Sequence, residues 1–171
     1  GKGVPTTRIA DYLGVSSASV SNMIKRLAKM GLADYESYYG TTLTPSGKKI
    51  ALEIIRHHRL LELYLMEVMG YSWDEVHEEA ENLEHHISER FEEKIAELLD
   101  HPTHDPHGDP IPSKDGVMPE VAREPLAEAD RGEKLIVGRV LDQNPELLRY
   151  LDTIGLIPGA DVEVIERATC Q

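Results

Sequence analysis

The chain has 171 residues, of which 40% are hydrophobic and 29% are charged. This length and composition are typical of a soluble protein with one large domain or two to three small ones. No run approaches the roughly 18 apolar residues of a membrane span, so we expect a cytoplasmic protein without a membrane partner. The single cysteine, Cys170, excludes a disulfide framework and argues against a cysteine-based zinc site.

The charge is distributed unevenly along the chain. Residues 1–59 carry nine Lys or Arg against four acidic residues, a balance of +5. The net charge of the whole chain is −13, so the remaining residues carry −18. Duplex DNA is bound largely through neutralisation of its phosphates by Lys and Arg. The sequence therefore predicts a first domain that faces a polyanion and an acidic second part that could hold cations.

The first 31 residues predict two helices joined by a turn. Thr6 or Thr7 can cap the first helix, which ends at Gly14. Ser16 can cap the second helix, which ends at Gly31. An apolar stripe repeats along the second helix at helical spacing: Val20, Ile24, Leu27 and Met30. A winged helix-turn-helix domain usually has a further helix before these two, and we expect that this helix is missing from the sequence.

A hairpin and further helices follow. Residues 32–36 and 41–44 predict two short strands, a hairpin of the size of a wing. Residues 48–70 form a long amphipathic pattern, and Ser72 can cap a helical stretch over residues 73–99 that is dense in Glu and His. These patterns predict a winged helix-turn-helix followed by packed helices.

The last part of the chain has a different character. Residues 101–125 are rich in proline, which predicts loop and linker structure. Beyond them we expect a strand at 134–141, a helix at 145–154 and a strand at 161–166. This order resembles the start of a small SH3-like barrel, and we expect this unit to be incomplete.

The second predicted helix has the side chains that a DNA-reading helix needs near its beginning. Short polar groups can approach base edges in the major groove, while basic residues hold phosphates. Asn22 can pair with adenine through two hydrogen bonds, and the methyl group of Ala18 can contact a thymine methyl. The predicted DNA-binding residues are Thr7, Ser16, Ser17, Ala18, Ser19, Asn22, Lys25 and Arg26.

Histidines and glutamates recur at helical spacing in the acidic part. One stripe has the spacing i, i+4, i+7 and i+8, which places its members on one side of a helix: His77, Glu81, Glu84 and His85. His58 and Glu62 form a further i, i+4 pair on the preceding helix. Imidazoles and carboxylates suit manganese or ferrous iron, although a solvated acidic helix face has the same pattern.

A third set of candidates lies in the proline-rich loop. His101, His104 and His107, with Asp105 and Asp109, have the spacing of a metal site. Prolines between them hold the backbone extended, so we expect an ordinary surface turn here and not a ligand cluster.

Together these features are similar to the DtxR/MntR family of iron- and manganese-dependent repressors, along nearly the whole chain. The matching stretches are Thr7 to Asn22, Leu43-Thr-Pro-Ser-Gly47, His58-Arg-Leu-Leu-Glu62, His77 with Glu81-Asn-Leu-Glu-His85, and Gly108-Asp-Pro-Ile-Pro112. The resemblance implies a homodimer joined through the helical domain, with each recognition helix reading half of a palindromic operator.

The resemblance also implies two metal sites in each subunit. Ligands of the primary, activating site are expected at Glu81, Glu84 and His85. Ligands of the ancillary site are expected at His58, Glu62 and His77, although in the manganese branch the residue matching His58 belongs to the activating pair.

The resemblance bears on the metal as well. The iron branch has Cys at the position of Glu81, so a carboxylate there favours manganese over iron. Three-domain members take a further ligand from the third domain, for which Glu146 is the best candidate. The remaining primary ligands of the family come from the first helix, upstream of residue 1.

We therefore predict a mainly α protein with small β elements. Its expected parts are a winged helix-turn-helix domain (1–52), a helical metal-binding and dimerisation domain (53–119), a linker (120–125) and a partial SH3-like, FeoA-like domain (126–171). The expected function is repression of metal-homeostasis genes by a dimer that binds operator DNA when loaded with Mn(II) or Fe(II).

Two other functions fit parts of the sequence. A di-iron oxidase also uses carboxylates and His on facing helices, but it needs Glu-x-x-His motifs, which the residues before these histidines do not provide. No motif of a common catalytic family is present either, so we do not expect an enzyme. The closer alternative is a winged-helix regulator that senses a small organic ligand and has no metal role.

Overall fold

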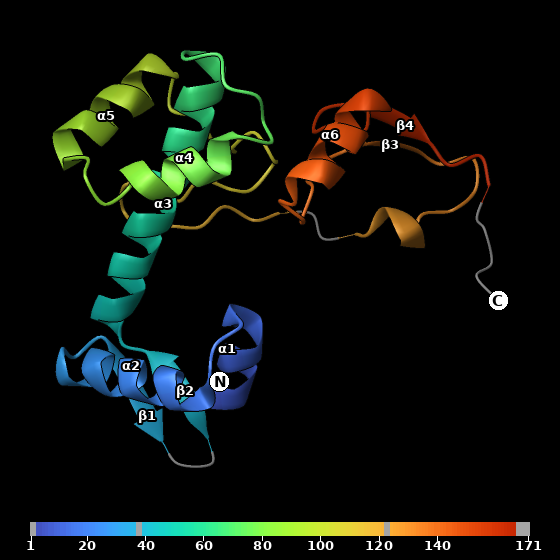
Figure 1. Cartoon of the computed structure of the whole chain (residues 1–171). Helices are drawn as coiled ribbons and strands as arrows, with labels where there is room; N and C mark the ends of the chain where they lie inside the picture. The colour runs from blue at the N-terminus through green and yellow to red at the C-terminus, as the bar shows by residue number, and fades with distance from the viewer. Residues whose placement is uncertain (1–2, 37–38, 122–123, 167–171) are drawn as a thin grey trace. The chain divides into compact units, whose positions relative to one another are not determined.

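The computed structural model describes residues 3–36, 39–121 and 124–166, which fall into two units, Gly1–Glu53 and Ile54–Gln171. The described part is mainly helical and contains two small antiparallel sheets, β1-β2 and β3-β4 (Figure 1). The fold class predicted from the sequence is confirmed in this respect. In the described ranges, no helix is both long and apolar enough to cross a membrane.

Two helices open the first unit. Helix α1 (Thr6–Leu13) begins after Pro5, which has extended backbone angles and makes no side-chain cap, so the prediction that Thr6 or Thr7 caps this helix is wrong. Gly14 ends α1 in the left-handed conformation that glycine adopts without strain. Helix α2 (Ser17–Lys29) has the predicted cap, because the hydroxyl of Ser16 accepts a hydrogen bond from the backbone N–H of Ser19.

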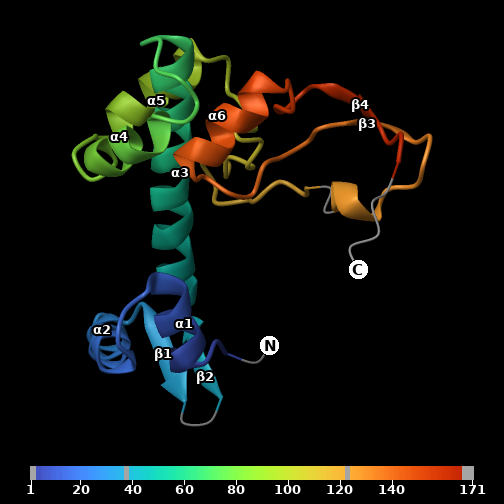
Figure 2. The ribbon, with the colours of Figure 1, turned by 45° about the vertical axis from the view of Figure 1, so that its right-hand side comes forward.

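The hairpin follows α2 in the first unit. Strand β1 (Ala33–Glu36) pairs with β2 (Gly40–Leu43) in an antiparallel register that sets Ala33 opposite Leu43. The two strands lie side by side in both views (Figures 1 and 2), and part of the turn between them, residues 37–38, lies outside the described residues. The core of this unit contains Ala10, Val20 and Ile24. The predicted winged helix is therefore present.

Three helices follow the hairpin, and the first of them begins in the first unit and continues into the second. Helix α3 (Pro45–Glu67) begins earlier than predicted, because Thr44 supplies a hydroxyl that accepts a hydrogen bond from the N–H of Gly47. Residues 73–99, expected to be helical, contain two helices, α4 (Val76–Leu83) and α5 (Glu89–Leu98). The chain leaves the helical path before Ser88, whose hydroxyl caps α5 by accepting from the N–H of Phe91.

The apolar faces of these three helices form one core. In both views α4 and α5 lie beside the later turns of α3 (Figures 1 and 2). The buried members of the core are Leu60, Leu61, Leu65, Val76, Ala80, Ile95, Ala96 and Ile111. Ile111 belongs to the loop after α5, so this core also holds part of the proline-rich segment in place.

The third part of the chain, within the same unit, is small. A 3-10 helix η1 (Leu126–Glu128) precedes β3 (Lys134–Ile136), which pairs with β4 (Asp161–Glu163) in an antiparallel register. Helix α6 (Pro145–Thr153) lies between them in the chain, and Asn144 caps it through its side-chain oxygen. The predicted strand, helix and strand are present, with shorter strands than the sequence pattern suggested.

Candidate metal centre and DNA-binding surface

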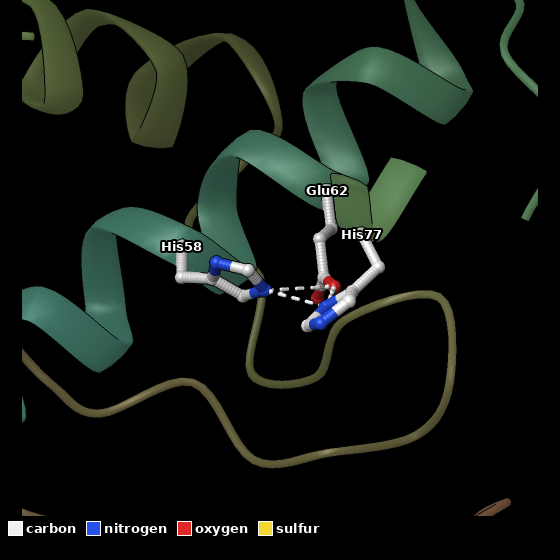
Figure 3. Close-up of side chains that lie close together, drawn as sticks. All are labelled: His58, Glu62 and His77. Carbon is white, nitrogen blue, oxygen red and sulfur yellow. Dashed lines mark hydrogen bonds and ion pairs between the residues drawn. The ribbon is translucent and has the colours of Figure 1, made fainter. Parts of the chain in front are cut away.

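Three predicted ligands converge between α3 and α4. His58 and Glu62 lie one turn apart on α3, and His77 points toward them from α4 (Figure 3). The Nε2 atom of His58 lies 3.0 Å from Oε1 of Glu62 and 3.0 Å from Nδ1 of His77. The same Glu62 oxygen lies 3.1 Å from Nδ1 of His77. We call His58, Glu62 and His77 the histidine group.

Glu84 contacts the histidine group from its outer side. Its Oε2 atom lies 2.8 Å from Nδ1 of His58, and its Oε1 atom lies 3.3 Å from Nε2 of His85. A carboxylate that accepts from one imidazole nitrogen leaves the other nitrogen to face a metal ion. Glu84 therefore orients His58 so that Nε2 faces Glu62 and His77.

The charges of the histidine group are strongly linked. Burial alone would lower the pKa of His58, but hydrogen bonds and attraction from Glu62 and Glu84 outweigh it and raise that pKa. Burial likewise opposes ionisation of Glu62, yet hydrogen bonds from His58 and His77 lower the pKa of Glu62 to about 2. A divalent cation would replace the His58 proton as the positive charge beside this carboxylate.

The proline-rich loop forms a second group, which corrects the prediction of an ordinary surface turn. His107 is fully buried, and Asp105 and Asp109 are each only 6% exposed. Ligand atoms of Glu62, Asp105 and His107 lie within 4.8 Å of one another. We call Glu62, Asp105 and His107 the buried group.

The polar atoms of the buried group are incompletely satisfied. Glu62 Oε2, Asp105 Oδ2 and His107 Nδ1 are buried and have no hydrogen-bond partner in the described part of the chain. Buried polar atoms without partners carry a cost of roughly 1–3 kcal/mol each, more for charged groups. One cation bound by all three atoms would remove that cost, so their chemistry fits a divalent metal ion.

The buried group also carries excess negative charge. Burial, followed by repulsion from Glu62 and Asp109, raises the pKa of Asp105 to about 7. Arg59 lies on α3 beside the loop, with Nε 3.6 Å from Asp105 Oδ2 and Nη1 2.5 Å from the carbonyl oxygen of Pro110. Arg59 therefore holds the loop against α3 while only partly compensating its carboxylates.

Other predicted ligands lie away from these two groups. Glu81 and His85 are exposed, and among the described residues neither is joined to the histidine group by a direct contact. The end of α4 before Glu84 explains the position of His85, because a stripe extrapolated over one helix loses its geometry there, but it does not explain Glu81, which lies within α4. Glu146 is exposed in the first turn of α6, and the structure does not bring it to either group.

The predicted DNA-binding residues all lie on the surface of the first unit. Their side chains are exposed on α1, at the start of α2 and along its outer face: Thr7, Ser16, Ser17, Ala18, Ser19, Asn22, Lys25 and Arg26. Two of them also have a local role, since the hydroxyls of Ser16 and Ser19 lie 2.9 Å apart at the cap of α2. Asn22, Lys25 and Arg26 have side chains directed to solvent, as DNA contact requires.

A winged helix joined to a helical unit with clustered His and carboxylate ligands defines a class of metal-responsive DNA-binding regulators. Sequence families agree with this class. Residues 1–41 match the iron dependent repressor N-terminal DNA binding domain, residues 44–113 match the iron dependent repressor metal binding and dimerisation domain, and residues 124–170 match the FeoA domain.

Individual relatives cover most of the chain. The iron-dependent repressor IdeR of Mycobacterium tuberculosis is 34% identical in an alignment that covers 92% of this chain and 74% of the relative. The transcriptional regulator MntR of Lysinibacillus sphaericus is 37% identical over 91 residues, 53% of this chain and 65% of the relative. A manganese-dependent transcriptional repressor, solved in complex with manganese, is 41% identical with a TM-score of 0.86, covering 98% of this chain and 77% of the other.

The chain therefore belongs to the iron-dependent repressor family. It is a metal-dependent transcriptional repressor, as the resemblance to the DtxR/MntR family predicted.

Proposed function

We propose that this repressor binds a palindromic operator as a cytoplasmic homodimer when loaded with Mn(II) or Fe(II), controls metal-homeostasis genes, and has no catalytic activity. The observation that carries this proposal is the convergence of His58, Glu62 and His77 in a chain that also contains a winged helix. The match to a metal binding and dimerisation domain supports both the metal and the dimer.

Manganese is the proposed physiological metal. The two groups, which lie among the described residues, offer imidazole nitrogens and carboxylate oxygens. Such donors suit Mn(II) and Fe(II), whereas thiolates favour softer metals. The manganese-dependent repressor that is 41% identical to this chain supports the same choice.

Glu62 would serve both groups with different oxygens. Its Oε1 atom faces His58 and His77, while its Oε2 atom lies 3.9 Å from Nδ1 of His107. We therefore propose a paired metal site around Glu62. Glu81, Glu84 and His85 remain the proposed ligands of the activating site, which adjoins the histidine group through the contact of Glu84 with His58, and Glu146 remains a further candidate from the third domain.

The DNA contacts divide into two kinds. Asn22 is proposed to read a base edge, with the short side chains of Ser17 and Ala18 beside it in the major groove. Lys25 and Arg26 are proposed to bind phosphates, which gives affinity without sequence preference.

The direct test is metal-dependent DNA binding by the full chain. Duplexes selected from a random library in the presence of Mn²⁺ supply the operator, and its affinity is then measured with chelator-treated protein before and after Mn²⁺ is restored. We expect Mn²⁺ to raise operator affinity by about 5- to 150-fold, the usual size of coupling between two sites. Glu62→Gln should lose most of this gain.

The control is Glu97→Gln, since Glu97 is exposed on α5 and its carboxylate pairs with Lys94 and with no other side chain among the described residues. This variant should respond to Mn²⁺ as the unchanged chain does. An operator affinity that is the same with and without Mn²⁺ or Fe²⁺ would refute the proposal and favour a regulator that senses another ligand.

A further inference from the structure

The loop that supplies the buried group is held by the third part of the chain. The backbone N–H of Val140 donates to the carbonyl oxygen of His107 at 2.9 Å. Nη2 of Arg139 lies 2.7 Å from Oδ1 of Asp109, which is largely buried. Residues 138–140 therefore contact the loop on both sides of Gly108. We call residues 138–140 the clasp.

Gly108 makes the close approach of the clasp possible. Its φ angle is +83°, a backbone conformation that residues with a side chain rarely adopt. A Cβ atom at this position would clash with the carbonyl oxygen of Gly138 and lie 2.9 Å from the Cα of Arg139. The backbone of the loop and the backbone of the clasp are thus in direct contact, with no side chain between them.

The ring of His107 is fixed from the opposite direction. Its Nε2 atom lies 2.8 Å from the carbonyl oxygen of Trp73, and because a carbonyl only accepts, Nε2 carries the hydrogen. The ring also stacks on Trp73, with centroids 5.8 Å apart and planes at 24°. Nδ1 is left as the nitrogen that faces Glu62 Oε2. His107 is therefore held by Trp73 at its ring and by Val140 at its backbone.

We propose that the clasp positions His107 and Asp105 for metal binding, with Arg139 as its principal positioning residue. This inference rests on the proposed function, because it requires a metal ion in the buried group. Arg139 pairs with Asp109, whose backbone N–H donates to Oδ1 of Asp105 at 2.9 Å. The ion pair therefore acts on Asp105 through one intervening residue and on His107 through the loop backbone.

The same contacts make the effect reciprocal. If the clasp raises the affinity of the buried group for metal, then bound metal must strengthen the clasp by the same free energy. The third part of the chain would thus be tied more firmly to the helical part in the metal-loaded protein. Chain segments that contribute no ligand can in this way contribute to metal affinity.

Arg139→Gln tests the inference in the full-length chain. Its matched control is Arg149→Gln, because Nη1 of Arg149 also lies 2.7 Å from a carboxylate oxygen, that of Asp74, which is outside the loop. Trp73 is the only tryptophan of the sequence and stacks on His107, so quenching of its fluorescence by Mn²⁺ reports on the buried group. Hydrogen exchange at Val140, followed by mass spectrometry with and without Mn²⁺, reports on the clasp.

Loss of a residue that orients metal ligands commonly lowers metal affinity about 10- to 100-fold. We expect Arg139→Gln to lower the Mn²⁺ affinity measured by Trp73 quenching by at least about 10-fold, and Arg149→Gln to change that affinity by less than about 3-fold. We also expect Mn²⁺ to slow exchange at Val140 in the unchanged chain but much less in Arg139→Gln.

Three outcomes would overturn the inference, and they are distinguishable. If Mn²⁺ quenches Trp73 equally in the unchanged chain and in Arg139→Gln, the buried group binds metal without help from the clasp. If Mn²⁺ restores operator binding but leaves Trp73 fluorescence unchanged, the repressor function stands and the buried group is not the metal site. If Arg139→Gln and Arg149→Gln lower the Mn²⁺ affinity equally, then general attachment of the third part of the chain to the helical part matters, and the clasp has no special role.

Discussion

Glu62 is the residue on which the two groups of ligands depend. It is completely buried on α3, and its two oxygens face different partners, His58 and His77 on one side and His107 on the other. A buried carboxylate is stable only with compensating positive charge. Hydrogen bonds and attraction from Glu62 and Glu84 raise the pKa of His58, so a proton on His58 and a metal ion compete to supply this positive charge.

This competition predicts a pH-dependent metal response. The pKa of Asp105 is raised from 3.8 to about 7, and that of His58 is raised above 6.5, so the folded metal-free protein binds these protons more tightly than the unfolded chain. The stability that the Asp105 proton contributes is therefore lost as pH rises from about 4 through about 7, and that of the His58 proton is lost as pH rises through the raised pKa of His58. Mn²⁺ displaces the protons, so the increase in Tm caused by Mn²⁺ should grow from about pH 5 to about pH 8.

Thermal unfolding of the full chain at a series of pH values, with and without Mn²⁺, measures this effect. Asp105→Asn serves as the comparison, because an amide does not titrate and its Mn²⁺ response should depend less steeply on pH. A Tm shift that is constant across this range, or that shrinks as pH rises, would contradict the assignment of protons to these sites.

At the residue scale the sequence predicted one group and missed the other. The i, i+4 pair of His58 and Glu62 indicates a shared face, because helical spacing alone places the two side chains one turn apart. Asp105 and His107 lie in a loop, where spacing does not determine direction or burial. The sequence signal that could have found them is the density of His and Asp around Gly108, but the prolines in the same segment favour a surface turn equally well.

At the scale of elements, the start of α2 combines a structural and a recognition role. The hydroxyl oxygen of Ser16 accepts a hydrogen bond from the backbone N–H of Ser19 and so stabilises the first turn. The hydroxyl of Ser17 makes no hydrogen bond within the described residues. Neighbouring serines of the same helix therefore provide a test that separates folding from DNA contact.

Ser16→Ala should lower the free energy of unfolding by about 1 kcal/mol, the usual cost of losing a helix cap. Ser17→Ala should leave stability nearly unchanged and weaken operator binding, since its hydroxyl is free to meet DNA. Urea unfolding gives the first quantity, and titration with the selected operator gives the second. Equal destabilisation by both substitutions would mean that the observed cap does not stabilise α2.

The presence of most helices could be predicted from the sequence, whereas the residues at which they begin and end were harder to predict. Ser16 marked the start of α2 correctly, because it supplies the oxygen that a first turn needs. The helix expected from residue 145 is α6, and the structure adds that Asn144 caps it. The break between α4 and α5 was not predicted, since the apolar face continues across it. Ser88 carried the signal, as a capping residue followed by acidic side chains, but the same residue is tolerated inside a helix.

At the scale of the whole molecule, ligands and DNA contacts belong to different units. Both the histidine group and the buried group lie within Ile54–Gln171, whereas the predicted DNA-binding residues lie within Gly1–Glu53. Each unit has a hydrophobic core of its own. A metal ion that binds these two groups should therefore stabilise the second unit directly and affect the first unit only through coupling.

Hydrogen exchange of the full chain can separate the two effects. At 100 times its dissociation constant, a ligand adds about 2.7 kcal/mol to the stability of the state that binds it. Mn²⁺ should therefore slow exchange most in residues 58–77 and 103–112, where the ligands lie. Residues 17–29 of α2 should slow strongly only when operator DNA is also present. If Mn²⁺ alone slows exchange in α2 as much as it does in α3 and the loop, the metal acts directly on the DNA-binding unit. The proposal that metal binding stabilises only the second unit directly is then wrong.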